Sequence, residues 1–452
     1  MAKQPQVDEL SRDELLKLIE DLRQQISQLR EENERLKRKH QRQAAPFSKE
    51  APVANPKKPG RKPGQGTFQH RPAPTLEPDI IVDVTAPANC PFCNGPLRPA
   101  GDEVATTTDI PEQPRPKVTE YRIAVCECRN CGRKVRGTAP GLAPDQYGAT
   151  AHRVSSSVMA AAHALHYGVG VPQRKVPGIL KELTGVSITQ SALAQDALRR
   201  AEGEVGAMYQ QLRLGIRQSP FVHTDDTGWQ VGGQPAFLMG FDTDEATVYQ
   251  IRPQHRNEEV REIIPADYAG VMITDRGKSY EAKELADVEQ QKCVGHLLRN
   301  ISDVVESKQG EARRFGVELK ELLQEAIALG RTRLSVSESE LAGNAAGLNE
   351  RLSYHLRPRL LDDKDNQRLL DGIGAQQEAG RLLRFLVPPF TEPTNNRAER
   401  ALRPAVIARK VSQCSKNSQG AEAFAAFTSI AQSAVKAGAS SVSAAFRQIF
   451  SG

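Results

Sequence analysis

Three acidic residues, spaced widely along the chain, are of the types that hold metal ions. Asp225 ends the strand-like run 221–225, Asp275 ends the strand-like run 270–275, and Glu399 lies in a stretch that predicts a helix. Hard divalent cations prefer oxygen ligands. Two such ions can clamp the attacking and leaving oxygens of a phosphodiester. We therefore predict one catalytic site in which these three residues hold two Mg²⁺ or Mn²⁺ ions.

The local sequence refines this prediction at two points. Adjacent strand residues point to opposite faces, so Asp225 and Asp226 cannot both face the site. We choose Asp225 because it shares a face with Phe221 and His223. The helix around Glu399 is otherwise basic, and we expect its arginines to contact DNA phosphates, namely Arg397, Arg400 and Arg403.

The cysteines indicate a second metal site. Two Cys-x-x-Cys motifs, at 90–93 and 128–131, each present a pair of thiolates, as the knuckles of a zinc ribbon do. We predict one structural Zn²⁺ in a ribbon over residues 79–140, held by Cys90, Cys93, Cys128 and Cys131. Cys126 could replace Cys128 as a ligand. Five of the seven cysteines cluster here, which favours metal over disulfides and a reducing compartment.

Both sites must be positioned by the elements around them. Strands and helices alternate over 215–300, which predicts the first part of a ribonuclease-H-like core. A helical insertion without a recognisable motif follows at 301–390, and 391–450 completes the core with the Glu399 helix and closing helices. The predicted fold class is therefore a multidomain α+β/α/β chain.

Residues 150–205 read as helices interrupted by the turn 185–187. Two helices joined by a short turn that contains glycine are typical of a helix-turn-helix. Gln190 and Gln195 would then read DNA sequence. Ordinary helical packing that leads into the core is the alternative interpretation.

The first 78 residues carry two different signals. Residues 8–39 form a heptad seam, with Leu15, Leu22, Leu29 and Leu36 at d and Ile19, Ile26 and Asn33 at a. A single Asn at a favours a parallel dimer, although a plain amphipathic helix has a similar pattern. Residues 40–78 are basic and rich in proline, which disfavours a packed core. This linker is interpreted either as a solvated tether or as a minor-groove arm whose DNA contacts are Lys57, Lys58, Arg61 and Lys62.

Composition narrows the class of protein. The chain has 452 residues and a net charge of +6, enough for three or more domains and mildly basic. No apolar run reaches the length needed to span a bilayer, and the N-terminus lacks the core of a signal peptide. We expect a soluble cytoplasmic protein with no membrane partner.

Several residues have weaker signals. Cys293 and His296 make only half of a zinc site, so His296 is interpreted as the start of a helix beside the catalytic face. Cys293, His296 and Asn396 are candidates for support of the active site. Trp229, the single tryptophan, is expected in the core rather than as a platform for base stacking.

These motifs together resemble a known family. His223-Thr224-Asp225-Asp226-Thr227, Cys293-Val294-Gly295-His296 and the run 394–404, which contains Asn-Asn-x-x-Glu, are similar to those of the insertion-sequence-66 transposases. The order of coiled coil, zinc segment and DDE core is also similar, although Asp226 and Val294 replace the usual Glu and Trp. The resemblance implies a bacterial, nucleoid-associated enzyme that transposes its own element. Its partners would be duplex DNA at terminal inverted repeats and at the target, further copies in a homodimer or higher oligomer, and accessory proteins of the element.

Two other functions fit part of the pattern. A catalytically inactive DNA-binding regulator derived from a transposase would use the coiled coil, ribbon and helix-turn-helix but leaves the three acids unexplained. A ribonuclease-H-like nuclease without strand transfer would use the acids but needs no dimerising or end-recognition modules.

Overall fold

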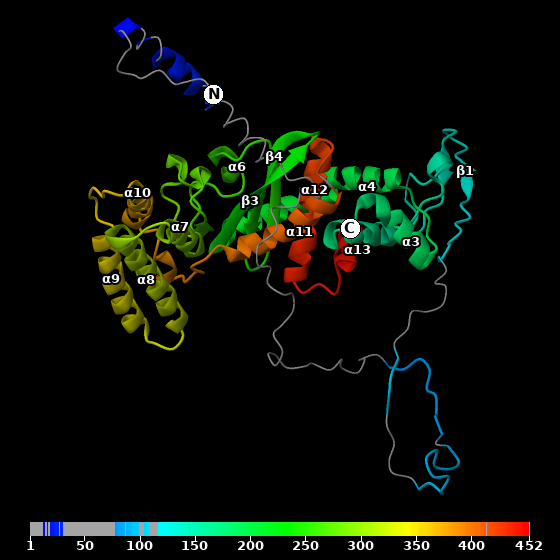
Figure 1. The fold of residues 1–452 in the computed structure, drawn as a ribbon. Coiled ribbons are helices and arrows are strands. Elements are labelled where there is room, and N and C mark those ends of the chain that lie inside the picture. The colour runs from blue at the N-terminus through cyan, green and yellow to red at the C-terminus, as the bar shows by residue number, and fades with distance from the viewer. Residues whose placement is uncertain are drawn as a thin grey trace, which may run out of the picture. The chain divides into compact units, whose positions relative to one another are not determined.

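The computed structural model describes most of the chain downstream of residue 76, namely 77–85, 87–98, 104–107, 116–143, 145–412 and 414–451, together with 12–13, 16, 19–26 and 28–29. The chain forms two compact units. One comprises residues 1–48, 119–182 and 186–452, and the other comprises 49–118 and 183–185. Helices and a mixed sheet make up the first unit (Figure 1).

The central sheet has five strands within the described residues, in the order β5-β4-β3-β6-β7. β3, β4 and β5 form an antiparallel meander, whereas β6 and β7 run parallel to β3. A tight turn at Gly232 and Gly233, both with positive φ, joins β3 to β4. The strand bounds are β3 (Phe221–Val231), β4 (Gln234–Asp242), β5 (Thr247–Arg252), β6 (Val271–Thr274) and β7 (Gln290–Lys292).

The strand β3 is longer than the sequence predicts. We expected it to end at Asp225, but it continues to Val231 because β4 pairs with it along its whole second half, as far as Val231 opposite Gln234. Asp225 therefore lies within a strand rather than at its end. It is just past the segment 221–223 that pairs with β6.

Separate apolar clusters cover the two faces of the sheet. On one face Trp229 and Leu238 pack against α11 (Asn396–Ser412) and α12 (Ser418–Lys436). On the other, Val222 packs with Ile216 of α5 (Glu204–Gln218) and Val260 of α6 (Asn257–Arg261). Trp229 is 2% exposed, which confirms the predicted core position.

Helices precede and follow the sheet in the same unit. The first helix before the turn 185–187 begins at Val176, next to Pro177, after a short 3₁₀ turn (Gln173–Lys175). Thr189 caps the next helix, because its hydroxyl accepts a hydrogen bond from Ala192 N at 3.1 Å. The helices are α2 (Ser156–His163), α3 (Val176–Thr184), α4 (Gln190–Glu202) and α13 (Val442–Ser451).

The predicted insertion is helical and has an apolar core of its own. Leu319, Leu352 and Ile373 are among the residues of this core. α8, α9 and α10 lie together at one end of the sheet (Figure 1). The bounds are α7 (Val294–Glu306), α8 (Gly310–Thr332), α9 (Glu338–His355) and α10 (Lys364–Glu378).

The N-terminal part is described only in pieces. The described residues between 12 and 29 are helical, and the seam residues Ile19, Leu22, Ile26 and Leu29 are all exposed. The other predicted seam residues Leu15, Asn33 and Leu36 lie outside the described residues. So do the predicted DNA-contacting residues of the linker, Lys57, Lys58, Arg61 and Lys62. No helix in the described part of the chain is long and apolar enough to cross a membrane.

Candidate active site

The register of the sheet brings the two predicted aspartates together. His223 of β3 pairs with Ile273 of the parallel strand β6. Asp225 lies two residues beyond His223 within β3, and Asp275 directly follows β6, which ends at Thr274. Side chains alternate along a strand, so Asp225 shares with Trp229 the face of the sheet that α11 covers, and the charge of Asp275 is near enough to raise the pKa of Asp225.

The helix α11 carries Glu399 across this face. Gly240 of β4 is the register partner of Asp225. A Cβ at Gly240 would lie 3.0 Å from Leu402 Cδ2, tighter than ordinary packing. The glycine therefore permits a close approach of α11 to the sheet, and Glu399 lies one turn before Leu402 on the same side of the helix.

The carboxylate of Glu399 also contacts α7. Its Oε1 is 3.2 Å from Arg299 Nη2 and 3.6 Å from His296 Nε2. The sequence indicated His296 but not Arg299. Arg299 could have been found from the sequence, because it lies three residues after His296 in the same helix, α7, and residues three apart on a helix share a face.

Four carboxylates share one electrostatic environment. Burial, together with the charges of Asp275, Asp226 and Glu399, raises the pKa of Asp225 to about 7, although the N–H of Asp226 acts to lower it. Like charges this close make ionisation costly unless a cation offsets them. The excess of negative charge and the all-oxygen donor set fit divalent cations.

Each acid of the site is bound to a protein donor. Asp225 Oδ1 accepts from Asp226 N at 2.9 Å, and Asp275 Oδ1 accepts from Gly277 N at 2.8 Å. Glu399 has its ion pair with Arg299. Across the described residues, no three Asp, Glu, His or Cys side chains stand at metal-holding distances. The structure thus brings the three predicted acids into one electrostatic cluster, without arranging them as a coordination shell.

Asp226 faces the opposite side of the sheet, as strand alternation requires. Its Oδ1 is 2.9 Å from His255 Nδ1, and His255 Nε2 is 3.1 Å from Ser279 Oγ. The sequence analysis missed His255 and Ser279, because neither lies in a recognisable motif. These two contacts connect the middle of β3, next to Asp225, to the segment that follows Asp275.

The two asparagines before Glu399 have different environments. Asn395 is 0% exposed, whereas Asn396, the candidate from the sequence, is exposed. Asn395 Oδ1 is 3.2 Å from His223 Nδ1, and burial lowers the pKa of His223 to about 4, so this histidine is neutral. Asn395 N donates to Cys293 Sγ at 3.1 Å, and burial raises the pKa of that thiol.

The three arginines predicted to contact DNA divide into two groups. Arg400 and Arg403 are exposed on α11. Arg397 is only 17% exposed in its side chain and binds Asp242 at 2.7 Å and Asp244 at 2.5 Å. The expectation that Arg397 contacts DNA is therefore revised, because its guanidinium is engaged inside the protein.

Comparison with known families decides the class of protein. The family model described as transposase IS66 family matches residues 152–423, which is more than half of the chain. The chain belongs to the IS66 transposase family. A second model, the zinc-finger binding domain of transposase IS66, matches residues 87–132. No curated protein matches the chain.

This IS66 transposase carries its four motif cysteines in two separate turns, all within the zinc-finger match. The backbone N–H groups of Phe92 and Cys93 lower the pKa of the Cys90 thiol. Those of Cys131 and Asn130 lower the pKa of Cys128 in the same way, in the turn between β1 (Val125–Glu127) and β2 (Lys134–Arg136). N–H groups that stabilise a thiolate prepare it for metal. The two turns fall in different units of the chain, so each pair is described by itself.

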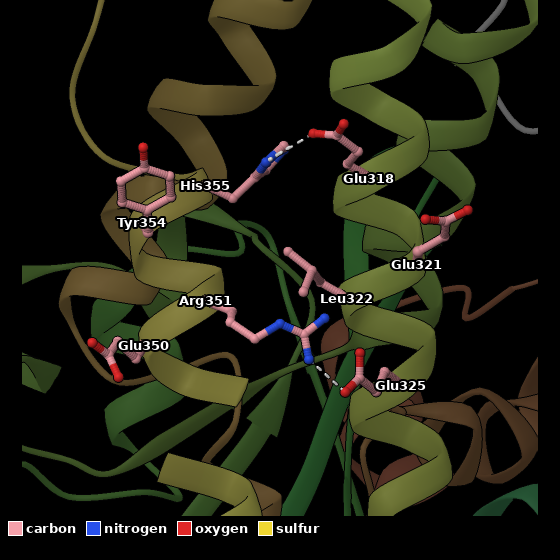
Figure 2. A pocket seen from close by; sticks show the side chains of 8 residues that line it. All are labelled: Glu318, Glu321, Leu322, Glu325, Glu350, Arg351, Tyr354 and His355. Carbon is pink, nitrogen blue, oxygen red and sulfur yellow. Dashed lines mark hydrogen bonds and ion pairs between the residues drawn. The ribbon is translucent and has the colours of Figure 1, made fainter. Parts of the chain in front are cut away.

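A pocket of the transposase lies away from the three acids. It has a volume of about 580 Å³ and lies between α8 and α9 (Figure 2). Its lining includes four glutamates against one arginine and one histidine, namely Glu318, Glu321, Glu325, Glu350, Arg351 and His355. Negative charge of this kind repels phosphate, so the pocket does not suit the DNA backbone.

Proposed function

We propose that this transposase uses Asp225, Asp275 and Glu399 as the acids of a DDE reaction. It would cleave DNA at the inverted-repeat ends of its own insertion sequence and join those ends to target DNA. One observation carries the proposal: Asp225 lies just past the segment of β3 that pairs with β6, Asp275 directly follows β6, and α11, which bears Glu399, covers the face of the sheet that Asp225 shares with Trp229. The pKa of Asp225, raised also by the charges of the other two acids, supports it.

The sheet topology supports a ribonuclease-H-like core. Three antiparallel strands precede two strands parallel to the first, and the first strand is central. We propose that residues 215–300 and 391–450 together form this core, with 301–390 as the insertion. β3 leaves β6 after His223 and continues beside β4 alone, so the end of β6 lies at a point where the sheet opens and a ligand site can form.

The chemistry follows from the residues of the cluster. Divalent ions, when bound, would activate a water or a DNA 3′-hydroxyl and offset the charge of the leaving oxygen. Asp225 interacts with both other acids, so it would serve both ions, whereas Asp275 and Glu399 would each serve one. Arg400 and Arg403 are exposed beside Glu399 and would hold the DNA backbone through its phosphates.

The other modules would hold and select DNA. We propose that residues 8–39 dimerise the protein through the exposed Ile19, Leu22 and Ile26, that 40–78 is a basic linker, and that 79–140 is a ribbon with one Zn²⁺ on its four cysteines. Residues 150–205 would contact the terminal repeats, with Gln190 and Gln195 exposed on α4. The enzyme would act on the nucleoid, in the cytoplasm of a bacterium.

Joining of a labelled terminal-repeat end to target DNA, with Mg²⁺ as the added variable, tests the proposal. Asp225→Asn, Asp275→Asn and Glu399→Gln should each lower the cleavage rate by about three orders of magnitude or more while DNA binding persists, because each removes charge that stabilises the transition state.

The matched control is Asp226→Asn, which changes the neighbouring acid on the opposite face. It should retain far more activity than Asp225→Asn, and the reverse order would show that the wrong aspartate has been chosen. Binding without metal-dependent cleavage by the wild type would favour the inactive regulator. Cleavage without joining would favour a nuclease.

A further inference from the structure

Asn395 lies where three elements of the active site meet. It is 0% exposed. Its Nδ2 donates to Thr224 O at 2.8 Å and its Oδ1 is 3.2 Å from His223 Nδ1, both on β3. Its backbone N donates to Cys293 Sγ at 3.1 Å, at the start of α7. One residue thus connects the sheet, α7 and the beginning of α11.

The orientation of the amide follows from its partners. A backbone carbonyl can only accept, so the NH₂ group must face Thr224 O. The amide oxygen then faces His223 Nδ1, which must carry the proton of the neutral ring. Both polar atoms of Asn395 are therefore used, and a substituent with two acceptors or none would break at least one bond.

A simple helix cap would look different. Asn395 stands directly before α11, and a capping side chain accepts from an N–H group of its own first turn. Here the backbone oxygen of Asn395 accepts from Glu399 N at 3.2 Å. The side-chain bonds that the structure describes go to β3 instead. The side chain therefore holds the start of α11 against β3 and does not cap the helix.

We propose that Asn395 is a positioning residue that sets the spacing between Asp225 and Glu399. Thr224, which its side chain binds, directly precedes Asp225, and Glu399 N bonds its backbone oxygen. A path of covalent and hydrogen bonds therefore leads from Asp225 through Thr224 and Asn395 to Glu399. The inference rests on the proposed function, because the spacing matters only if both acids hold the same pair of ions.

The test measures metal binding directly as well as catalysis. Calorimetric titration with Mn²⁺ is performed on the wild type, Asn395→Ala and Asn395→Asp, and the single-turnover cleavage rate and repeat-DNA affinity are measured beside it. Removing a group that orients metal ligands costs about 10- to 100-fold in metal affinity or activity. We expect both variants to lose that much Mn²⁺ affinity and cleavage rate, with repeat-DNA affinity within about twofold of wild type.

Asn366→Ala is the matched control for loss of a buried amide. Asn366 is 2% exposed, donates to Ala312 O at 2.6 Å and lies in α10 of the insertion. It should lower stability to a similar degree but leave Mn²⁺ affinity and the cleavage rate unchanged. Asn395→Asp keeps the shape of the side chain and its acceptor for His223 but loses the donor to Thr224 O, so it breaks one bond where Asn395→Ala breaks both. Urea unfolding of each variant shows that it is folded before the titration.

The outcomes separate this inference from the proposed function. If the wild type binds Mn²⁺ but does not cleave DNA, the proposed reaction fails while the titration still tests Asn395. If Asn395→Asp and Asn395→Ala bind Mn²⁺ as the wild type does, the positioning role is overturned even when cleavage is metal-dependent. Equal losses in Asn366→Ala would likewise overturn it, because they would reflect stability alone.

Discussion

Asp225→Asn is expected to stabilise the protein when no divalent ion has been added, by an amount that grows with pH. Burial and the neighbouring acids raise the pKa of Asp225 to about 7 in the folded protein. An unfolded aspartate has a pKa of about 3.9. The folded state therefore binds the proton more tightly, so the free energy of unfolding falls as pH rises from about 4 to about 7 and is level above that.

The magnitude follows from the pKa difference. Each unit corresponds to about 1.36 kcal/mol, so ionising Asp225 costs about 4 kcal/mol at pH 8 and about 1.5 kcal/mol at pH 5. An asparagine resembles the protonated acid in shape, and its oxygen can still accept from Asp226 N, as Asp225 Oδ1 does. The variant should gain about those amounts relative to the wild type.

Urea unfolding, followed through Trp229, measures this directly. Trp229 is the single tryptophan, lies on β3 with Asp225 and is 2% exposed. At pH 8, Mg²⁺ should stabilise the wild type but much less the variant, which lacks one carboxylate of the site. Asp226→Asn is the control and should gain much less, because the buried carboxylate of Asp225 remains and the contact with His255 is weakened. An equal gain at pH 5 and pH 8 would refute the shared electrostatic environment of the acids.

Three further predictions concern other parts of the chain. Arg397→Ala should lower the free energy of unfolding by roughly 3 kcal/mol, because it leaves the buried Asp242 short of a partner, whereas the exposed Arg400→Ala should weaken DNA binding and leave urea unfolding unchanged. Freshly purified protein should contain one zinc per chain by elemental analysis, and a zinc-free preparation would contradict this. After chelation, Cys90 and Cys128 should be alkylated faster at neutral pH than Cys293, because the pKa values of their thiols are lowered and that of Cys293 is raised. The reverse order of alkylation would contradict this reasoning. Deleting residues 41–71 should weaken binding to terminal-repeat and random DNA by similar factors and flatten the log–log salt slope by about 0.9 for each phosphate that the linker neutralises, and a weakening confined to repeat DNA would show that the linker reads sequence.

The types of the main elements could be predicted from local patterns. Apolar alternation and Gly-Gly signals predicted the strands of the meander, and Thr247–Arg252 has the same bounds in the structure. The end of β3 could not be predicted. The polar run after Asp225 stays extended because it pairs with β4, and local strand propensity does not report such pairing.

The sequence alone determined which residue types were available for chemistry, namely three acids and two cysteine pairs, because motifs and alternation are local properties of the chain. Only the tertiary structure decided which neighbours they have. It turned Arg397 inward to Asp242, and it buried Asn395 rather than Asn396. Those outcomes depend on how α11 crosses the sheet opposite Gly240. Contacts between segments more than a hundred residues apart produce no periodic pattern in either segment, so they cannot be predicted from the sequence alone.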